Sequence, residues 1–372
     1  MFAVGGEPTL VVDAQVHIWD ASPHNQAIPD GEAYAQGLLR RHRELDGWAT
    51  DRPAVPSYEV ERVTEDGLNR DVFGDGHVDR AVLQPVVLDD LFVLGFSPLE
   101  WHAEMAGWMP GRFVLSGELD PDGGQPGARG LTPRVRRFGL RGLTLCERRR
   151  PAGRLSLADP WLRRTLARCG QAGADVVHIG VGPSTRPAPW RRQDEEPTGA
   201  PRGRPPRVPR WAEPVRAGSA LPARTGAAAR VAPPGFDVRQ FRELATALPQ
   251  IRFVLGAGCL PSEQLCALAR LPNVHVMLTE ILPWTSSMGF AHAFGALLAA
   301  FGPERLLFGS GYPMMRPGRL VSELTEYRFP AEFRHRYPRF DATAKRAVLG
   351  GNAARLYRIT PSARLARTAA GA

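Results

Sequence analysis

The chain has almost no lysine: Lys345 is its single lysine, and the other basic residues are arginines. The formal net charge is +9, a value at which a nucleic-acid partner has to be considered. Most of the excess, however, lies in residues 183 to 234, which lack the aromatic interleaving of single-stranded nucleic-acid surfaces. The arginine bias fits the codon usage of a GC-rich genome. We therefore expect no nucleic-acid partner.

Cysteines and long apolar runs are also scarce. The four cysteines are spread along the chain, which favours reduced thiols over a disulfide framework. No apolar run approaches the roughly 20 residues that span a bilayer. The first eight residues lack the basic and then apolar order of a signal peptide. These absences predict a cytoplasmic protein with no membrane partner.

Short runs rich in Val, Leu and Ile alternate with helical patterns along the chain, as in proteins with buried parallel strands. The predicted strands are Thr9–His17, Arg80–Val86, Arg112–Leu119, Gly139–Leu145, Ala174–Ile179, Ile251–Gly256, Asn273–Thr279 and Arg305–Gly309. The predicted helices are Pro160–Gln171, Asp237–Leu248, Ser262–Leu271, Gly289–Phe301 and Thr343–Tyr357. Ser156 or Asp159 is the expected N-cap of the first helix, and Asp237 that of the second. Eight such units in series predict a (β/α)₈ TIM barrel. A doubly wound open sheet is the alternative, because a strand count does not show closure.

Three regions fall outside the alternation. Residues 21 to 56 carry Pro, Asp and Gly and are expected to form a loop over the barrel mouth, with a short helix near Tyr34–Leu45. Residues 183 to 234 have no hydrophobic period and too little apolar surface to offset chain entropy, so they are predicted to be a disordered Arg/Pro-rich insertion or a frameshift product. The tail, 360 to 372, is predicted to be disordered. The barrel itself is assigned to residues 1 to 359.

Functional groups of a barrel lie at the C-terminal ends of its strands. Gln15 and His17 are two positions apart on the first predicted strand, so their side chains point to the same face. His178 lies near the end of the fifth predicted strand. We expect the two histidines to share a pocket. The alternative is that both are polar core residues whose hydrogen bonds are satisfied by nearby backbone.

Several segments resemble the amidohydrolase superfamily, in particular the amidohydrolase-related branch that holds decarboxylases and lactonases. The segments that carry the resemblance are Asp13-Ala14-Gln15-Val16-His17, Val177-His178-Ile179-Gly180, Phe253-Val254-Leu255-Gly256-Ala257-Gly258, Leu306-Leu307-Phe308-Gly309-Ser310-Gly311-Tyr312-Pro313 and Gly351-Asn352-Ala353-Ala354-Arg355-Leu356-Tyr357. They occur in the family's order and span nearly the whole chain except the Arg/Pro-rich stretch. The resemblance implies a TIM barrel that hydrolyses or decarboxylates a small organic substrate.

The resemblance also implies a divalent metal held by two first-strand histidines, histidines of the fifth and sixth strands, and an eighth-strand aspartate. Those positions here hold Gln15, His17, His178, Ala257 and Gly311. A Gln carbonyl is a poor ligand for Zn²⁺, and Ala and Gly offer no donor. We therefore expect no tightly bound metal. A weakly bound divalent ion such as Zn²⁺ on His17 and His178 is the alternative.

Further candidate residues lie near the predicted strand ends. Glu280 is predicted to be a catalytic acid or base or a substitute ligand, unless it is a solvated loop residue. Cys259, in a turn, is either a thiol activated by its surroundings or an inert one. Gln15, Trp19, Cys259 and Tyr312 are predicted to contact a planar or cyclic organic acid.

Three functions follow from these observations. The first is a hydrolase or carboxy-lyase for a small cyclic or carboxylated compound, in which His17 and His178 polarise the substrate carbonyl and Glu280 or Asp120 assists with a proton. The second is a catalytically inactive barrel that acts as a binding or scaffold protein. The third is a weak mononuclear metallohydrolase. The expected partner is a small molecule, and no feature of the sequence sets an oligomeric state.

Overall fold

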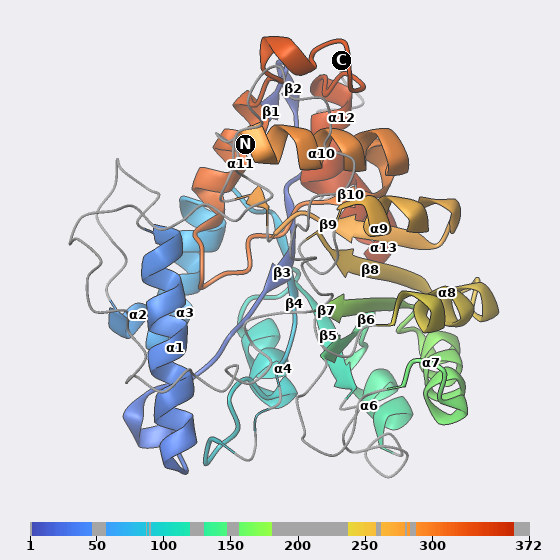
Figure 1. Cartoon of the computed structure of the whole chain (residues 1–372). Coiled ribbons are helices and arrows are strands. Elements are labelled where there is room, and N and C mark those ends of the chain that lie inside the picture. Colours follow the sequence, from blue (N-terminus) through green and yellow to red (C-terminus); the bar gives the residue numbers. More distant parts are fainter. Residues whose placement is uncertain are drawn as a thin grey trace, which may run out of the picture.

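The computed structural model places eight parallel strands in one sheet with the order β10-β9-β8-β7-β6-β5-β4-β3 (Figure 1). It describes residues 2–46, 57–86, 88, 91–119, 130–146, 156–180, 237–257, 262–279, 281–282 and 288–360. The strands are β3 (Val12–Val16), β4 (Arg80–Leu83), β5 (Phe113–Leu119), β6 (Gly142–Cys146), β7 (Val176–Gly180), β8 (Arg252–Gly256), β9 (Val274–Met277) and β10 (Leu306–Leu307). Each overlaps a predicted strand, so the strand prediction is confirmed. A small hairpin, β1 (Ala3–Val4) and β2 (Glu7–Pro8), precedes them.

The sheet closes into a barrel between β3 and the chain that follows β10. The Ala14 amide donates to the Phe308 carbonyl at 3.0 Å, and the Gly311 amide donates to the Gln15 carbonyl at 2.9 Å. The His17 amide donates to the Tyr312 carbonyl at 2.9 Å, and Val16 and Tyr312 form a parallel bridge. These bonds exclude the open doubly wound alternative and confirm the (β/α)₈ barrel.

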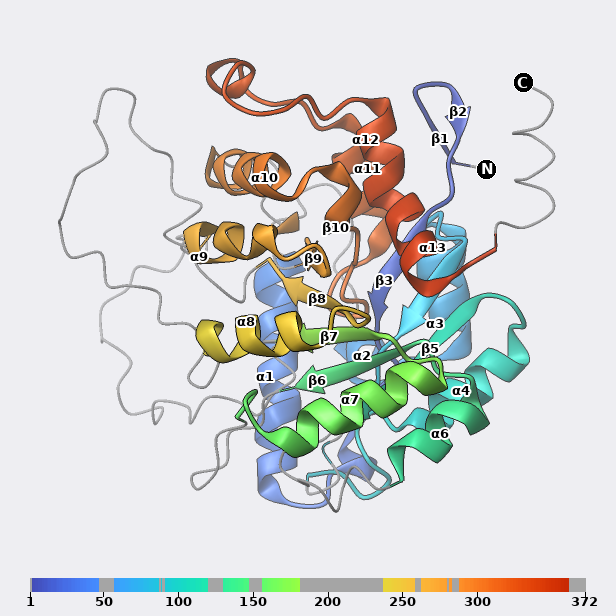
Figure 2. The same cartoon turned by 90° about the vertical axis from the view of Figure 1, so that its right-hand side faces the viewer.

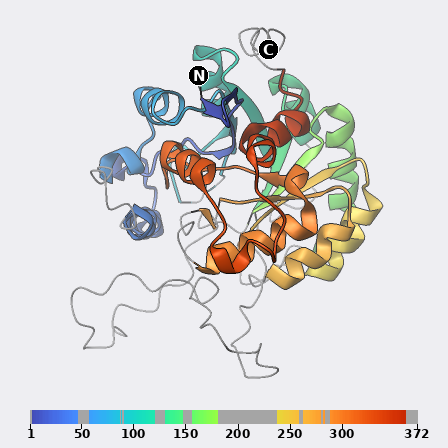
Figure 3. The ribbon, with the colours of Figure 1, turned by 90° about the horizontal axis from the view of Figure 1, so that it is seen from above.

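Helices cover the outside of the strands. In Figure 2, α7 and α8 lie in front of strands β6 to β8, and Figure 3 shows α1 and α2 on the opposite side of the molecule. The larger helices are α1 (Pro29–Asp46), α4 (Leu99–Trp108), α6 (Leu131–Phe138), α7 (Pro160–Ala172), α8 (Val238–Ala247), α10 (Met288–Phe301) and α11 (Pro317–Glu326). Short ones are α2 (Ser57–Glu61), α3 (Glu65–Leu68), α9 (Ser262–Ala267), η1 (Pro23–Asn25), η2 (Asn69–Gly74), η5 (Leu268–Arg270), η7 (Pro303–Arg305), η8 (Ala331–Phe333), α12 (Ala342–Arg346), η9 (Ala347–Gly351) and α13 (Asn352–Tyr357).

Two predicted caps begin their helices as expected. The carboxylate of Asp159 accepts from the Trp161 amide at 3.1 Å, and so it, rather than Ser156, caps α7. Asp237 caps α8 by accepting from the amides of Arg239 and Gln240. Both carboxylates satisfy amides that have no partner within the first turn of a helix.

Two local predictions are corrected. The stretch after the first strand is not mainly a loop, because α1 is a helix of 18 residues that buries Tyr34 and Leu38. The predicted continuous helix Thr343–Tyr357 is instead three segments, with the π-helical turn η9 between α12 and α13. Gly350 lies in that turn, where an added Cβ would be 2.0 Å from the Leu10 carbonyl oxygen. The turn therefore brings the chain into close backbone contact with the start of β3.

The barrel interior has an apolar layer. Its members come from strands across the barrel and from α13, and they are Val12, Ala14, Val82, Val176, Val254, Met277, Leu307, Ala353, Leu356 and Tyr357. Because side chains alternate along a strand, the inward residues one step further toward the mouth are Gln84 after Val82 and His178 after Val176. Polar groups thus follow directly on the apolar layer.

The predicted disordered segments, 183 to 234 and the tail from 360, lie outside the described residues apart from Thr360. Within the described ranges, no helix combines the length and apolar character needed to cross a bilayer.

Candidate active site

His17 lies just after β3, and its two ring nitrogens have different partners. Its Nδ1 is 2.8 Å from the backbone carbonyl oxygen of Gln84. A carbonyl only accepts, so Nδ1 carries the proton and Nε2 has the lone pair. Nε2 lies 3.5 Å from the amide nitrogen of Gln15. Burial lowers the pKa of His17 to about 4, against the opposing effect of the Gln84 carbonyl, so the imidazole is neutral at pH 7.

His178 on β7 is held in the opposite tautomer. The side-chain amide of Gln84 donates to the Ala14 carbonyl at 2.9 Å and to Nδ1 of His178 at 3.0 Å. Nδ1 therefore accepts, and the protonated Nε2 donates to the hydroxyl of Tyr357. Burial, with a smaller contribution from His17, lowers the pKa of His178 to about 3. Both nitrogens of this ring have partners inside the protein.

Gln84 joins the two histidines, and the sequence assigned it no role. Its backbone oxygen anchors His17 and its side chain anchors His178. The signal in the sequence was its place two residues after the inward-facing Val82. Tyr357 was recognised only as part of the closing helix, since 179 positions separate it from His178.

Of the predicted substrate contacts, Gln15 and Trp19 adjoin His17. The Trp19 ring stacks on His17 with centroids 5.8 Å apart and on Phe96 at 5.2 Å. Its indole N–H donates to the Val60 carbonyl at 2.7 Å. With only 3% of its surface exposed, Trp19 supports the His17 ring from the side of the core.

Tyr312 is turned away from this pair. Its backbone forms a parallel β-bridge with Val16, and the Val16 side chain packs in the core outside the barrel interior. Its hydroxyl donates to the Asp71 carboxylate at 3.3 Å, and Asp71 in turn pairs with Arg70 at 2.8 Å. The structure therefore places the phenol in an outer polar cluster instead of beside the two histidines.

Glu280, Cys259 and the proposed proton carrier Asp120 lie outside the described residues. Glu118, on β5, is paired in register with Thr144 on β6, and Thr144 is paired with His178. Ser116 faces the interior beside Tyr357 and Gly142, so Glu118, two positions later, faces it nearer the mouth. The register thus places a half-buried carboxylate at the inner mouth.

Asp13 joins β3 to the chain after β10. Its Oδ1 accepts from the amides of Gln15 at 3.1 Å and Ser310 at 2.8 Å. Complete burial raises the pKa of Asp13 to about 6, although its hydrogen bonds with Ser310 and Gln15 lower it. The contacts position the strand end that carries Gln15 and His17.

The residues at the positions where the resemblance implies metal ligands are a poor set of donors for a divalent ion. Ala257 offers no donor, and His178 has both nitrogens in hydrogen bonds. Gly311 has φ +70°, and an added Cβ would be 2.9 Å from Cγ2 of Thr279, so a carboxylate there would require Thr279 to shift. Among the residues with described positions, no three His, Cys, Asp or Glu side chains form a cluster suited to a metal. This donor set does not fit a resident divalent ion.

Comparison with solved structures shows the same barrel in several proteins. An uncharacterised TIM-barrel protein from Bordetella bronchiseptica has a TM-score of 0.57 at 17% identity, with 94% of this chain and 98% of that chain covered. A protein from Pseudomonas putida assigned as a 2-pyrone-4,6-dicarboxylic acid hydrolase has a TM-score of 0.51 at 15% identity, with 95% and 100% covered. The 5-carboxyvanillate decarboxylase LigW2 from Novosphingobium aromaticivorans, solved as a mutant with bound manganese, has a TM-score of 0.53 at 14% identity, with 96% and 100% covered.

A search of curated proteins gave no match. The family model described as Amidohydrolase matches residues 12 to 359, which include every strand of the barrel and the closing helix α13. The chain therefore belongs to the amidohydrolase family.

Proposed function

We propose that the protein is a metal-independent hydrolase of small cyclic carboxylated compounds, with His17 as its general base. The observation that carries the proposal is the neutral His17 ring, whose Nδ1–H is held by the Gln84 carbonyl and whose Nε2 lone pair has a long contact, 3.5 Å, with the Gln15 amide at the strand end. A positioned neutral imidazole can take a proton from water within hydrogen-bond reach. The Gln15 amide, 3.5 Å away, would orient that water or the substrate.

In the proposed reaction, Nε2 of His17 takes one proton of a water molecule while its oxygen forms a bond to the ester or lactone carbonyl carbon. The bond from that carbon to the ring or leaving oxygen then breaks, and the imidazolium returns its proton to this oxygen. Glu118, at the inner mouth, is the proposed second group to hold a proton. No oxidant, reductant or metal enters this balance.

The substrate class rests on the structural relatives. The names of two of them specify ring compounds with carboxylates, 2-pyrone-4,6-dicarboxylic acid and 5-carboxyvanillate. Hydrolysis is favoured over decarboxylation because the decarboxylase was solved with manganese, whereas the donor set of this chain does not suit a metal.

A second candidate is a barrel that binds the same compounds without turnover. The observation in its favour is His178, whose two ring nitrogens are both in hydrogen bonds inside the protein. A weak metallohydrolase, the third function expected from the sequence, would need donors that the described residues do not supply.

The test is the replacement His17→Ala, assayed on 2-pyrone-4,6-dicarboxylate and on phenyl acetate after treatment with a chelator. We expect kcat/KM to fall by about 100-fold or more, the usual contribution of a general base. The matched control is His24→Ala, an exposed histidine, which should keep wild-type activity. Equal rates for wild type and His17→Ala would refute the role of His17. Complete loss of activity on chelation alone would favour a metalloenzyme, and binding without hydrolysis would favour the second candidate.

A further inference from the structure

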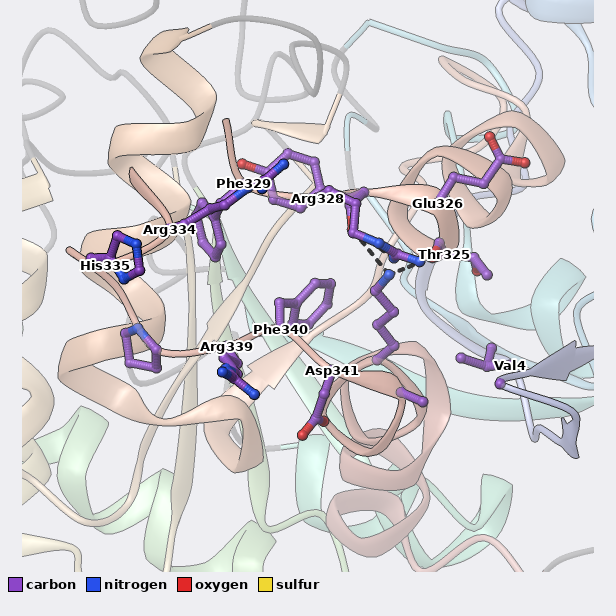
Figure 4. A pocket seen from close by; sticks show the side chains of 15 residues that line it. Val4, Thr325, Glu326, Arg328, Phe329, Arg334, His335, Arg339, Phe340 and Asp341 are labelled. Carbon is purple, nitrogen blue, oxygen red and sulfur yellow. Dashed lines mark hydrogen bonds between the residues drawn. The ribbon is translucent and has the colours of Figure 1, made fainter. Parts of the chain in front are cut away.

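A pocket of about 680 Å³ lies outside the barrel, between the end of α11, the segment that follows it, α12 and the β1–β2 hairpin. Figure 4 shows Phe340 in the middle of this pocket with Arg328, Arg334 and Arg339 around it. None of the residues that line it belongs to the candidate active site.

The charge of the lining is unbalanced. Four cationic side chains, Arg328, Arg334, Arg339 and Lys345, face two carboxylates, those of Glu326 and Asp341. One of these carboxylates is already engaged, because Asp341 accepts from the Ala344 amide at 2.9 Å and caps α12. In the described part of the chain, no ion pair joins any of the four cations to an acid.

Lys345 forms the inner end of the pocket. Its ammonium group donates to the carbonyls of Thr325 at 2.6 Å and Tyr327 at 3.0 Å and lies 5.6 Å from the centre of the Phe340 ring. An ammonium group has three protons to donate, so the two carbonyls leave one. Burial and then the nearby Arg328 lower the pKa of Lys345 to about 8. The fold thus holds Lys345 near Arg328, and within the described residues neither cation forms an ion pair with an acid.

We propose that this pocket binds a small organic carboxylate, with its charged group among Arg328, Arg334 and Arg339. Guanidinium groups pair with carboxylates through parallel N–H bonds. The aromatic and aliphatic side chains of Phe329, Pro338 and Phe340 provide an apolar surface for a flat body. An anion would also relieve the repulsion between Lys345 and Arg328. This ligand site is additional to the barrel mouth.

The single lysine of the chain makes the test selective. Protein labelled with ¹⁵N and ¹³C only in lysine gives one side-chain nitrogen resonance, that of Nζ of Lys345, which reports on this pocket and on no other place. Titration with benzoate should shift that resonance to saturation. Inorganic phosphate should bind more weakly because it lacks an apolar body, and sodium chloride at equal ionic strength should give no saturable shift.

The variant Arg334→Ala/Arg339→Ala should weaken benzoate binding at least tenfold. Both arginines are exposed, so the fold should tolerate their loss. The matched control is Arg163→Ala/Arg164→Ala, which removes the same charge from the exposed face of α7 and should stay within twofold of wild type. Repeating the titration with His17→Ala should give the wild-type curve.

Three results would overturn the proposal. One is a Lys345 resonance that does not saturate with benzoate, or that sodium chloride shifts equally. Another is an unchanged affinity in Arg334→Ala/Arg339→Ala. The third is phosphate binding as tight as benzoate binding, which would mean that the pocket binds an inorganic anion and not specifically an organic carboxylate.

Discussion

The β3 side and the β7 side of the barrel interior each hold one histidine, and the same residue, Gln84, anchors both in opposite ways. At His17 a backbone oxygen accepts the hydrogen bond from Nδ1–H, and the lone pair of Nε2 has a long contact, 3.5 Å, with the Gln15 amide. At His178 a side-chain amide donates to Nδ1, and Nε2–H is used by Tyr357. The difference shows that the hydrogen-bond partner of one ring nitrogen decides what the other nitrogen can do. One histidine is suited to chemistry and the other to stability.

The largest expected effect on stability comes from removing the locked histidine. His178→Ala leaves the Gln84 amide and the Tyr357 hydroxyl without their partner and opens a cavity, so we expect the free energy of unfolding to fall by about 3 kcal/mol. Urea denaturation measures this change. His24→Ala, at an exposed site, should change it by less than about 0.5 kcal/mol. A loss for His178→Ala as small as that of the control would contradict the hydrogen-bonded arrangement.

A second expectation concerns pH. The folded-state pKa values of His17 and His178 lie below the ordinary value of 6.5, so between pH 6.5 and about 4 the unfolded chain binds more protons. Stability from these groups is therefore present above pH 6.5 and is lost as the pH falls through this range, by about 3 kcal/mol for one such group. Asp13 acts oppositely, since its raised pKa makes the folded state bind more protons between about pH 4 and 6.

A comparison of wild type with His178→Ala cancels the contribution of Asp13 to the pH dependence of stability, because both proteins contain Asp13. The free energy of unfolding of the variant, measured from pH 4 to 7.5, should depend less steeply on pH than that of wild type. Parallel curves would mean that His178 is not buried in its neutral form.

The rate of hydrolysis by the wild type should decline only as the pH falls toward 4, where His17 gains a proton.

The smallest expected effect on stability distinguishes the role of His17 from that of His178 most clearly. Gln84→Met removes the side-chain bonds to Ala14 and His178 but keeps the backbone carbonyl that holds His17. We expect a loss of about 1–2 kcal/mol in stability with kcat/KM within about threefold of wild type. The two measurements are urea denaturation and the hydrolysis assay. A collapse of activity equal to that of His17→Ala would show that the two histidines act as one unit.

Much of the architecture was readable from the sequence because it depends on local patterns. Each apolar run became a strand, and Asp159 and Asp237 capped their helices, since a cap needs only amides two or three residues away. The continuous helix predicted at residues 343 to 357 was wrong because Gly350 meets the Leu10 backbone, a contact across the whole chain. The order of family motifs likewise indicated the barrel that the family model and the relatives show.

The sequence by itself determined the eight strands, the place of Gln15, His17 and His178 at or near their ends, and the absence of donors at Ala257 and Gly311. Only the tertiary structure decided the tautomer of each histidine, the linking role of Gln84 and the outward direction of Tyr312. The physical reason is that a tautomer depends on which donor or acceptor reaches a nitrogen in space. The partners here, Gln84 with His178 and Tyr357 with His178, are separated by 94 and 179 positions, and barrel closure alone brings them together.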